Sequence, residues 1–221
     1  KKQRRTINTT ESFNEWRTIL NTHLGHLSKP QVTVLALWSY GMVLARSCGL
    51  NRVVATLAST LGEKEDNLRQ RLREWCWEKE QKKGAQRSDW EVRQSFEPLL
   101  KWVLSLWRAE GRQLALAMDA TSLKKIFVVL SISVVYRGCA IPVAWAVLPE
   151  GKPGSWKQPW LSLFQDLHGA IPADWEVIVM ADRGLYARWL WESIQACGWH
   201  PFLRINAQSM YRPKGKSAFL H

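Results

Sequence analysis

Long apolar runs are missing from this chain, and so are the usual cysteine and histidine metal motifs. No run is long enough to span a membrane, and the basic start KKQRR (1–5) is followed by no signal-peptide core, which predicts a cytoplasmic protein without a membrane partner. The four cysteines (Cys48, Cys76, Cys139 and Cys197) form no CxxC pair, and the five histidines show no ligand spacing. We therefore expect the cysteines to be small apolar fillers in a reducing compartment, not zinc ligands or disulfides.

Acidic residues are scarce relative to basic ones. The 221 residues include 31 Lys and Arg against 19 Asp and Glu, a net charge of +12. This balance favours a polyanionic partner, and nucleic acid is the common one. At 46% hydrophobic residues, the chain can bury a core and divide into two domains.

The hydrophobic period changes near residue 113. Before it, apolar residues recur at helical spacing, which predicts helices at 11–24, 31–46, 51–61, 67–77 and 89–110. After it, β-branched runs predict strands at 114–118, 126–136, 139–148, 175–181 and 200–205, with helices at 156–168 and 185–197. Arg137-Gly138 predicts a hairpin turn between the second and third strands. The expected domains are a basic arm (1–10), a helical domain (11–110) and a mixed-sheet domain (111–221).

Two aspartates follow apolar strands: Asp119 after the first and Asp182 after the fourth. Carboxylates brought together by adjacent strands are ligands that Mg²⁺ prefers, and such a pair suits phosphoryl transfer. Each acid also has a structural interpretation. Asp119 could cap a turn through Thr121 or Ser122, and Asp182 could cap the helix that begins near Leu185.

The residues around these acids resemble a known family. The matching segments are LAMDAT (116–121), SISVVYRG (131–138), IPVAW (141–145) and ADRGLY (181–186). They resemble the DDE transposases of bacterial insertion sequences, in the group with a β-rich insertion between the second and third acids. The resemblance implies a helical DNA-binding domain followed by an RNase H-like catalytic core of mixed sheet.

The chain departs from the family pattern in two places. The family's third acid, a Glu within Tyr-x2-Arg-x3-Glu-x6-Lys, has no counterpart here, so we expect an N-terminal fragment truncated after strand five with an incomplete active site. Glu192 is the nearest substitute, although a solvated helix face explains it better. Family members often have Gly-Asp or similar after the first strand, where this chain has Lys124-Lys125. This loop is therefore expected to contact DNA differently.

The resemblance implies a transposase that binds its element's terminal inverted repeats as a homodimer, in the bacterial cytoplasm with the nucleoid. It would cleave DNA and join it to target DNA by cut-and-paste transposition. Asp119 and Asp182 would hold two Mg²⁺ ions, which Mn²⁺ can replace. The alternatives are an RNase H-fold nuclease without strand transfer and a catalytically inactive, transposase-derived DNA-binding protein.

A second set of residues is expected to contact DNA. The helical pair at 51–77 resembles a helix-turn-helix, and its second helix presents Arg69, Gln70, Arg71 and Arg73. Spacing predicts that Arg69 and Arg73 read bases while Arg71 meets backbone or an acidic neighbour. The alternative is a basic solvated helix face. The further DNA-contact candidates are Lys124, Lys125, Lys152, Lys157 and Arg183, the last of which could equally form a surface salt bridge.

Overall fold

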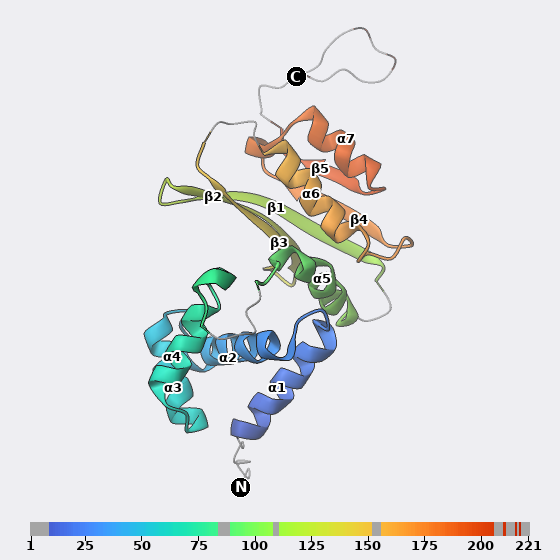
Figure 1. Ribbon diagram of the computed structural model, residues 1–221. Helices are drawn as coiled ribbons and strands as arrows, with labels where there is room; N and C mark the ends of the chain where they lie inside the picture. Colours follow the sequence, from blue (N-terminus) through green and yellow to red (C-terminus); the bar gives the residue numbers. More distant parts are fainter. Residues whose placement is uncertain are drawn as a thin grey trace. The chain divides into compact units, whose positions relative to one another are not determined.

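The computed structural model describes residues 9–83, 89–107, 111–151 and 156–205, together with residues 210, 215 and 217. These residues form a mixed α/β fold in which helices come first and a five-stranded mixed sheet follows (Figure 1). The chain divides into two compact units, Lys1–Ser95 and Phe96–His221. The boundary thus precedes the expected one at residue 110, because helix α5 (Phe96–Ser105) packs on strand β3 and helix α6 of the second unit.

The first unit contains four α-helices: α1 (Thr9–His23), α2 (Lys29–Ala45), α3 (Leu50–Leu61) and α4 (Glu65–Glu74). Short 3-10 helices follow at Lys79–Gln81 and Val92–Ser95. The core is formed by apolar side chains at helical spacing, including the fully buried Val53, Leu57 and Leu72. Gly41 brings α2 and α3 close together, since a Cβ on it would lie 2.7 Å from Val53 Cγ1.

The chain reversals after α2 and α3 begin at residues in a left-handed conformation. Gly62 ends α3 with φ of 70°. Arg46 ends α2 with φ of 47°. Helix α1 begins at Thr9, inside the predicted basic arm, whose residues 1–8 lie outside the described part.

The second unit is built on a sheet with the order β3-β2-β1-β4-β5. Its strands are β1 (Gln113–Leu123), β2 (Phe127–Tyr136), β3 (Cys139–Pro149), β4 (Glu176–Ala181) and β5 (His200–Leu203). Strand β1 pairs antiparallel with β2 and parallel with β4, and β5 pairs parallel with β4. Helix α6 (Lys157–His168) packs on β3, and α7 (Arg188–Ala196) packs on β5.

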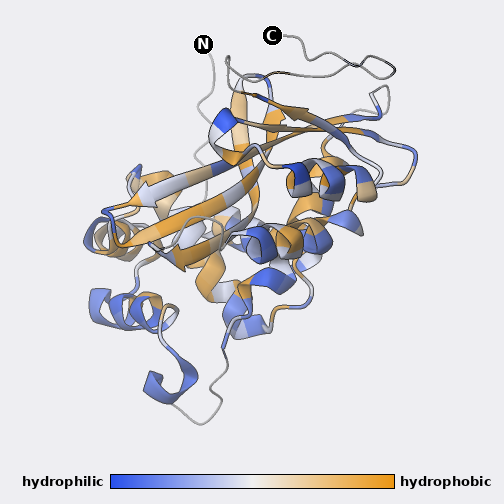
Figure 2. Cartoon of the chain, turned by 90° about the horizontal axis from the view of Figure 1, so that it is seen from above, coloured by the Kyte–Doolittle hydropathy of each residue, from blue (hydrophilic) through white to orange (hydrophobic). Residues whose placement is uncertain are grey.

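One face of the sheet supplies the core. Every second side chain is buried on β1 as far as Met118, on β2 from Val128 to Val134 and on β4, and Leu116, Ile132 and Val179 are fully buried. The strands are drawn largely in orange in Figure 2, in keeping with this composition. The hairpin predicted at Arg137-Gly138 is confirmed, with φ of 48° and 80° at the two residues.

Three expectations need correction. Strand β1 does not end at Met118 but continues to Leu123, because β2 remains paired with it to that point. The helix predicted at 89–110 is shorter, with a 3-10 turn at Val92–Ser95 before α5. The helix predicted from Leu185 is likewise split into a 3-10 turn, Arg183–Leu185, and α7.

The cysteines are free, as predicted, but three of them are not core fillers. Cys48, Cys76 and Cys139 are exposed because each lies in or beside a turn, and only Cys197 is partly buried. Burial raises the pKa of the Cys197 thiol. No single described helix is long and apolar enough to cross a membrane; α2 and α3 meet the criterion only as a pair, bent by 94°.

Candidate active site

The parallel register of β1 and β4 brings the two predicted acids together. Met118 pairs with Ala181, the last residue of β4, so the next residues are Asp119 on β1 and Asp182 directly after β4. Neighbouring strands lie about 4.8 Å apart, and residues at the same level of a parallel pair point to the same face. Both carboxylates are exposed. Two residues separated by 63 positions in sequence thus meet at one end of the sheet.

Each carboxylate is oriented by its own chain segment. Thr121 Oγ1 donates a hydrogen bond of 2.5 Å to Asp119 Oδ2. The backbone N–H of Gly184 donates one of 3.0 Å to Asp182 Oδ1, so Asp182 caps the 3-10 turn Arg183–Leu185. The structural interpretation of Asp182 as a cap is therefore realised, whereas Asp119 bonds Thr121 within β1 and caps no turn. These two bonds leave Asp119 Oδ1 and Asp182 Oδ2 without a hydrogen bond from any described residue.

The pair provides the oxygen ligands that a hard divalent cation prefers. The described residues contain no group of three or more acids, histidines or cysteines that could hold a metal ion. Glu192 adds no third ligand, because Arg188 Nε holds its carboxylate at 2.8 Å on the exposed surface of α7. The donor set thus fits a cation bound by two carboxylates, with its remaining positions open to water or substrate.

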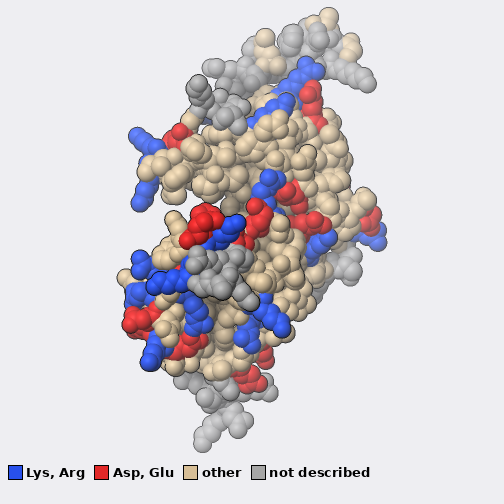
Figure 3. Space-filling model, in the orientation of Figure 1, with Lys and Arg blue, Asp and Glu red and all other residues tan. Residues whose placement is uncertain are grey.

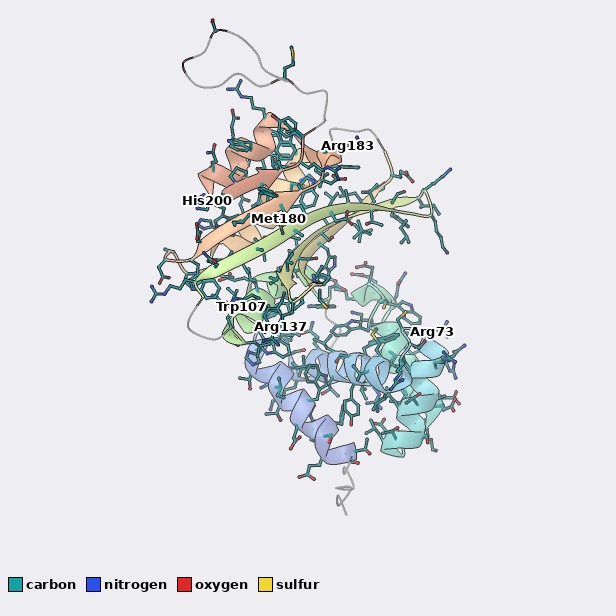
Figure 4. All side chains as sticks on the ribbon, turned by 180° about the vertical axis from the view of Figure 1, so that it is seen from behind. Arg73, Trp107, Arg137, Met180, Arg183 and His200 are labelled. Carbon is teal, nitrogen blue, oxygen red and sulfur yellow. The ribbon has the colours of Figure 1, made fainter. Side chains whose placement is uncertain are left out.

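The two acids project from the less covered face of the sheet. On β4 and β5 that face carries Ile178 at 40% exposure and Phe202 at 71%. Met180 and His200 lie on the same face, on neighbouring strands, and both are labelled in Figure 4. An extended ligand could therefore approach the acids across this surface.

Arg183 follows Asp182 directly and is exposed (Figure 4). Within the described part of the chain no carboxylate lies within ion-pair distance of it, so the predicted surface salt bridge is not formed there. A free guanidinium one residue from a candidate metal ligand can bind a phosphate. Lys157 is exposed at the start of α6, and Lys152 lies outside the described residues.

Lys124 and Lys125 form the turn between β1 and β2. Both have positive φ, 53° and 54°, and both are exposed. The turn is closed by a hydrogen bond of 3.1 Å from Ile126 N–H to Leu123 C=O. The sequence analysis placed both lysines in a loop but did not predict a tight hairpin turn, because the segment lacks the Asn or Gly that such a conformation favours.

On α4 the four predicted DNA-contact residues have different surroundings. Arg71 pairs with Glu63, which confirms its predicted acidic neighbour. Arg69 donates to Asn51 Oδ1 at 2.5 Å and to Glu65 at 3.3 Å. Gln70 donates to Glu74 at 2.8 Å.

Arg73 is the least constrained arginine of this helix. Its side chain is exposed and has no hydrogen bond or ion pair with another described residue (Figure 4). It lines a shallow groove of about 250 Å³. The other residues that line it are Asp66, Arg69, Gln70, Glu74, Trp77 and Lys83.

The groove is also lined by two residues outside α4 that helical spacing did not predict as DNA contacts. Trp77 and Lys83 lie beyond the end of α4, and neither shares its helical period. The N-cap of α3 is Gly49, and the side chain of Asn51 accepts a hydrogen bond from Arg69. Only the arrangement of α3 against α4 reveals these roles.

Comparison with known proteins adds little. No family model and no curated protein matches the chain. Among solved structures it is similar to one described as "Crystal structure of the Mos1 Strand Transfer Complex", with a TM-score of 0.26 and 15% sequence identity. The match covers 67% of this chain and 52% of that chain. A likeness of this size supports no conclusion about function.

Proposed function

We propose that this protein is a DDE-type DNA transposase of a bacterial insertion sequence. It would bind the ends of its element and carry out metal-dependent DNA strand cleavage and strand transfer by the cut-and-paste route. The observation that carries the proposal is the register of β1 and β4, which sets Asp119 beside Asp182. Three antiparallel strands followed by two parallel strands and their helices is also the arrangement expected of an RNase H-like core.

In this proposal Asp119 and Asp182 hold two Mg²⁺ ions through their exposed carboxylates, and Mn²⁺ can replace them. When bound, the ions supply activation of an attacking oxygen and stabilisation of the leaving oxygen of a phosphodiester. Thr121 and the Gly184 N–H each bond one carboxylate oxygen and so limit the rotation of the two side chains. Arg183 contributes a fixed positive charge that binds the phosphate.

The proposed partner is double-stranded DNA: the terminal inverted repeats and the target, bound by a homodimer of the protein in the bacterial cytoplasm. A net charge of +12 and the exposed Arg73, Lys83, Lys124, Lys125 and Lys157 support this partner. On α4, the base-reading role belongs first to Arg73, whose guanidinium has no partner among the described residues.

The test uses Asp119→Asn and Asp182→Asn. Mn²⁺ binding to the protein, followed by electron paramagnetic resonance, should fall at least tenfold in each variant, because a carboxylate ligand becomes a neutral amide. Cleavage of end DNA by the protein should be lost, whereas end binding should persist. The matched control is Glu192→Gln, which alters an exposed acid held by Arg188.

Two outcomes would overturn the assignment. Normal Mn²⁺ binding in both aspartate variants would show that these acids are structural caps only. Loss of Mn²⁺ binding in Glu192→Gln would place the ion elsewhere. Assays with pre-cleaved ends separate a transposase, which joins them to target DNA, from the nuclease alternative.

A further inference from the structure

The β1–β2 hairpin extends beyond the candidate active site. Strand β1 pairs with β4 only as far as Met118, but it pairs with β2 as far as Leu123. The segment from Asp119 to Leu123 thus continues as a ribbon with β2 and β3, ending at the left of the sheet in Figure 1. At about 3.4 Å per residue, Leu123 lies about 14 Å beyond Asp119.

Positive charge gathers at the end of this ribbon. Lys124 and Lys125 are exposed, and neither forms an ion pair with a described residue. In Figure 3 blue side chains stand at this end of the sheet, with a red one beside them. The nearby acid is Glu150, whose N–H bonds Ile126 C=O and whose Oε1 accepts from Ser122. The carboxylate is therefore partly engaged, and two lysines remain for an anionic ligand.

Both lysines adopt a conformation that disfavours them. The left-handed conformation brings the Cβ of any residue other than Gly close to the following carbonyl oxygen and is therefore unfavourable for Lys. Asn-Gly would form such a turn without that cost. The folded chain therefore holds two cations at the tip at the expense of stability, as is common for residues that serve a binding function.

Apolar side chains surround the charged tip. The exposed fractions are 50% for Leu123, 57% for Ile126, 42% for Phe127 and 56% for Val147. Leu123 pairs with Phe127, and strand alternation sets Leu123, Phe127 and Val147 on the same face as Asp119. Exposed apolar residues between cations are the composition of proteins that insert a wedge between base steps of DNA.

We propose that the end of the β1–β2 hairpin is a wedge for duplex DNA. Lys124 and Lys125 bind backbone phosphates, while Leu123, Ile126 and Phe127 press against a base step and unstack it. Since base pairs rise about 3.4 Å each, the step lies about four base pairs from the phosphodiester bound at Asp119 and Asp182. The inference depends on the proposed function for its ligand, duplex DNA.

The experiment follows 2-aminopurine fluorescence in end duplexes that carry the probe at successive positions from the cleavage site. Unstacking raises the fluorescence of this base, and wild-type protein should raise it most at one step, about four base pairs away. The double variant Lys124→Asn/Lys125→Gly should remove this signal and lower duplex affinity about tenfold. Its turn is favourable, so a folding defect is not expected to explain the loss.

Two further variants complete the test. Phe127→Ser should reduce the fluorescence rise while most of the affinity persists, because it removes an apolar group and no charge. Arg137→Asn is the matched control, since Arg137 is also a cation at positive φ in a hairpin turn, at the opposite end of the sheet beside Trp107 (Figure 4). It should leave affinity and fluorescence unchanged.

The outcomes distinguish this inference from the proposed function. If wild-type protein binds no duplex, the proposed function fails. If it binds and cleaves without a localised fluorescence rise, or if the double variant keeps both signal and affinity, the wedge is wrong. A double variant that keeps DNA binding but loses affinity for phosphatidylserine vesicles would show that the tip contacts a membrane surface instead.

Discussion

Asp182 is held by the backbone of a residue two positions later. A Cβ added to Gly184 would lie 3.3 Å from Asp182 Oδ1, tighter than an ordinary contact. Gly184→Ala should therefore displace the carboxylate by a few tenths of an ångström and weaken Mn²⁺ binding about threefold to tenfold, with little change in the free energy of unfolding. Titration of Mn²⁺ monitored by electron paramagnetic resonance measures the effect.

Gly169→Ala is the matched control for this substitution. A Cβ on Gly169 would meet another carboxylate, Glu97 Oε1, at 3.4 Å. Glu97 pairs with Lys101 and belongs to no candidate site. A similar loss of Mn²⁺ binding in both variants would contradict the role of Gly184 in positioning Asp182.

His26 is expected to make the stability of the first unit depend on pH. Partial burial of its imidazole, which desolvates the charged form, lowers the pKa of this group. Its Nε2 lies 2.9 Å from Ser95 Oγ, which accepts a hydrogen bond from Trp90 Nε1 at 3.1 Å. Ser95 can therefore donate its own proton to a neutral imidazole, whereas a protonated imidazole offers no acceptor.

The sign of the pH effect follows from this lowered pKa. As the pH falls, His26 is protonated first in the unfolded chain, near pH 6.5. The contribution of neutral His26 to the free energy of unfolding is therefore complete above that pH, and it is lost as the pH falls through the pKa of His26 in the folded chain. Between pH 7.5 and 5.5 the wild type should lose more stability than His26→Gln, measured by urea unfolding. His200→Gln, at an exposed position of β5, serves as the control. Equal pH dependence in the wild type and His26→Gln would show that His26 is not responsible.

The arginines of helix α4 are expected to differ in role: Arg71 contributes to stability and Arg73 to DNA binding. Arg71→Ala breaks the ion pair with Glu63 and should cost roughly 0.5 kcal/mol of unfolding free energy, because the pair is partly exposed. Arg73→Ala should leave stability within about 0.5 kcal/mol and instead weaken duplex binding. Fluorescence anisotropy with end and scrambled duplexes distinguishes the two possible contacts of Arg73.

If Arg73 contacts a base, its loss should cost about 1–3 kcal/mol of binding free energy on the end duplex alone. If it contacts a phosphate, its loss should weaken binding to both duplexes alike. Urea unfolding of the same variants supplies the control for folding. If Arg71→Ala loses as much duplex affinity as Arg73→Ala, the division between the two arginines is wrong.

At the scale of the whole molecule, the net positive charge is expected to determine how the affinity for duplex DNA depends on salt concentration. Each phosphate contact contributes about 0.9 to the slope of log affinity against log salt concentration. With a net charge of +12, we expect a slope of about −4 or steeper for a scrambled duplex. Lys124→Asn/Lys125→Gly should reduce that slope by about 1.8. Anisotropy titrations at several NaCl concentrations measure it, and a slope near zero would exclude nucleic acid as the partner of this charge.

The sequence alone was sufficient to locate most helices and strands of both units. The spacing of apolar residues is a local property of the chain. The elements that it predicts agree with α2, α3, β2 and β3 of the structure, whose ends differ from the predicted ones by at most two residues. Arg137-Gly138 predicted its turn because glycine tolerates positive φ. The sequence also predicted that Asp119 and Asp182 follow apolar strands, because a buried strand is recognisable from its run of apolar residues.

Only the tertiary structure decided which of these residues meet and which stay free. The register of β1 on β4, and the continuation of β1 past Asp119 beside β2, depend on pairing between segments far apart in sequence. The different environments of Arg69, Arg71 and Arg73 depend on Asn51 and Glu63, which α3 and its following turn supply. Helical spacing allowed an acidic neighbour for Arg71 but could not identify it, because packing and ion pairing act across the folded chain rather than along it.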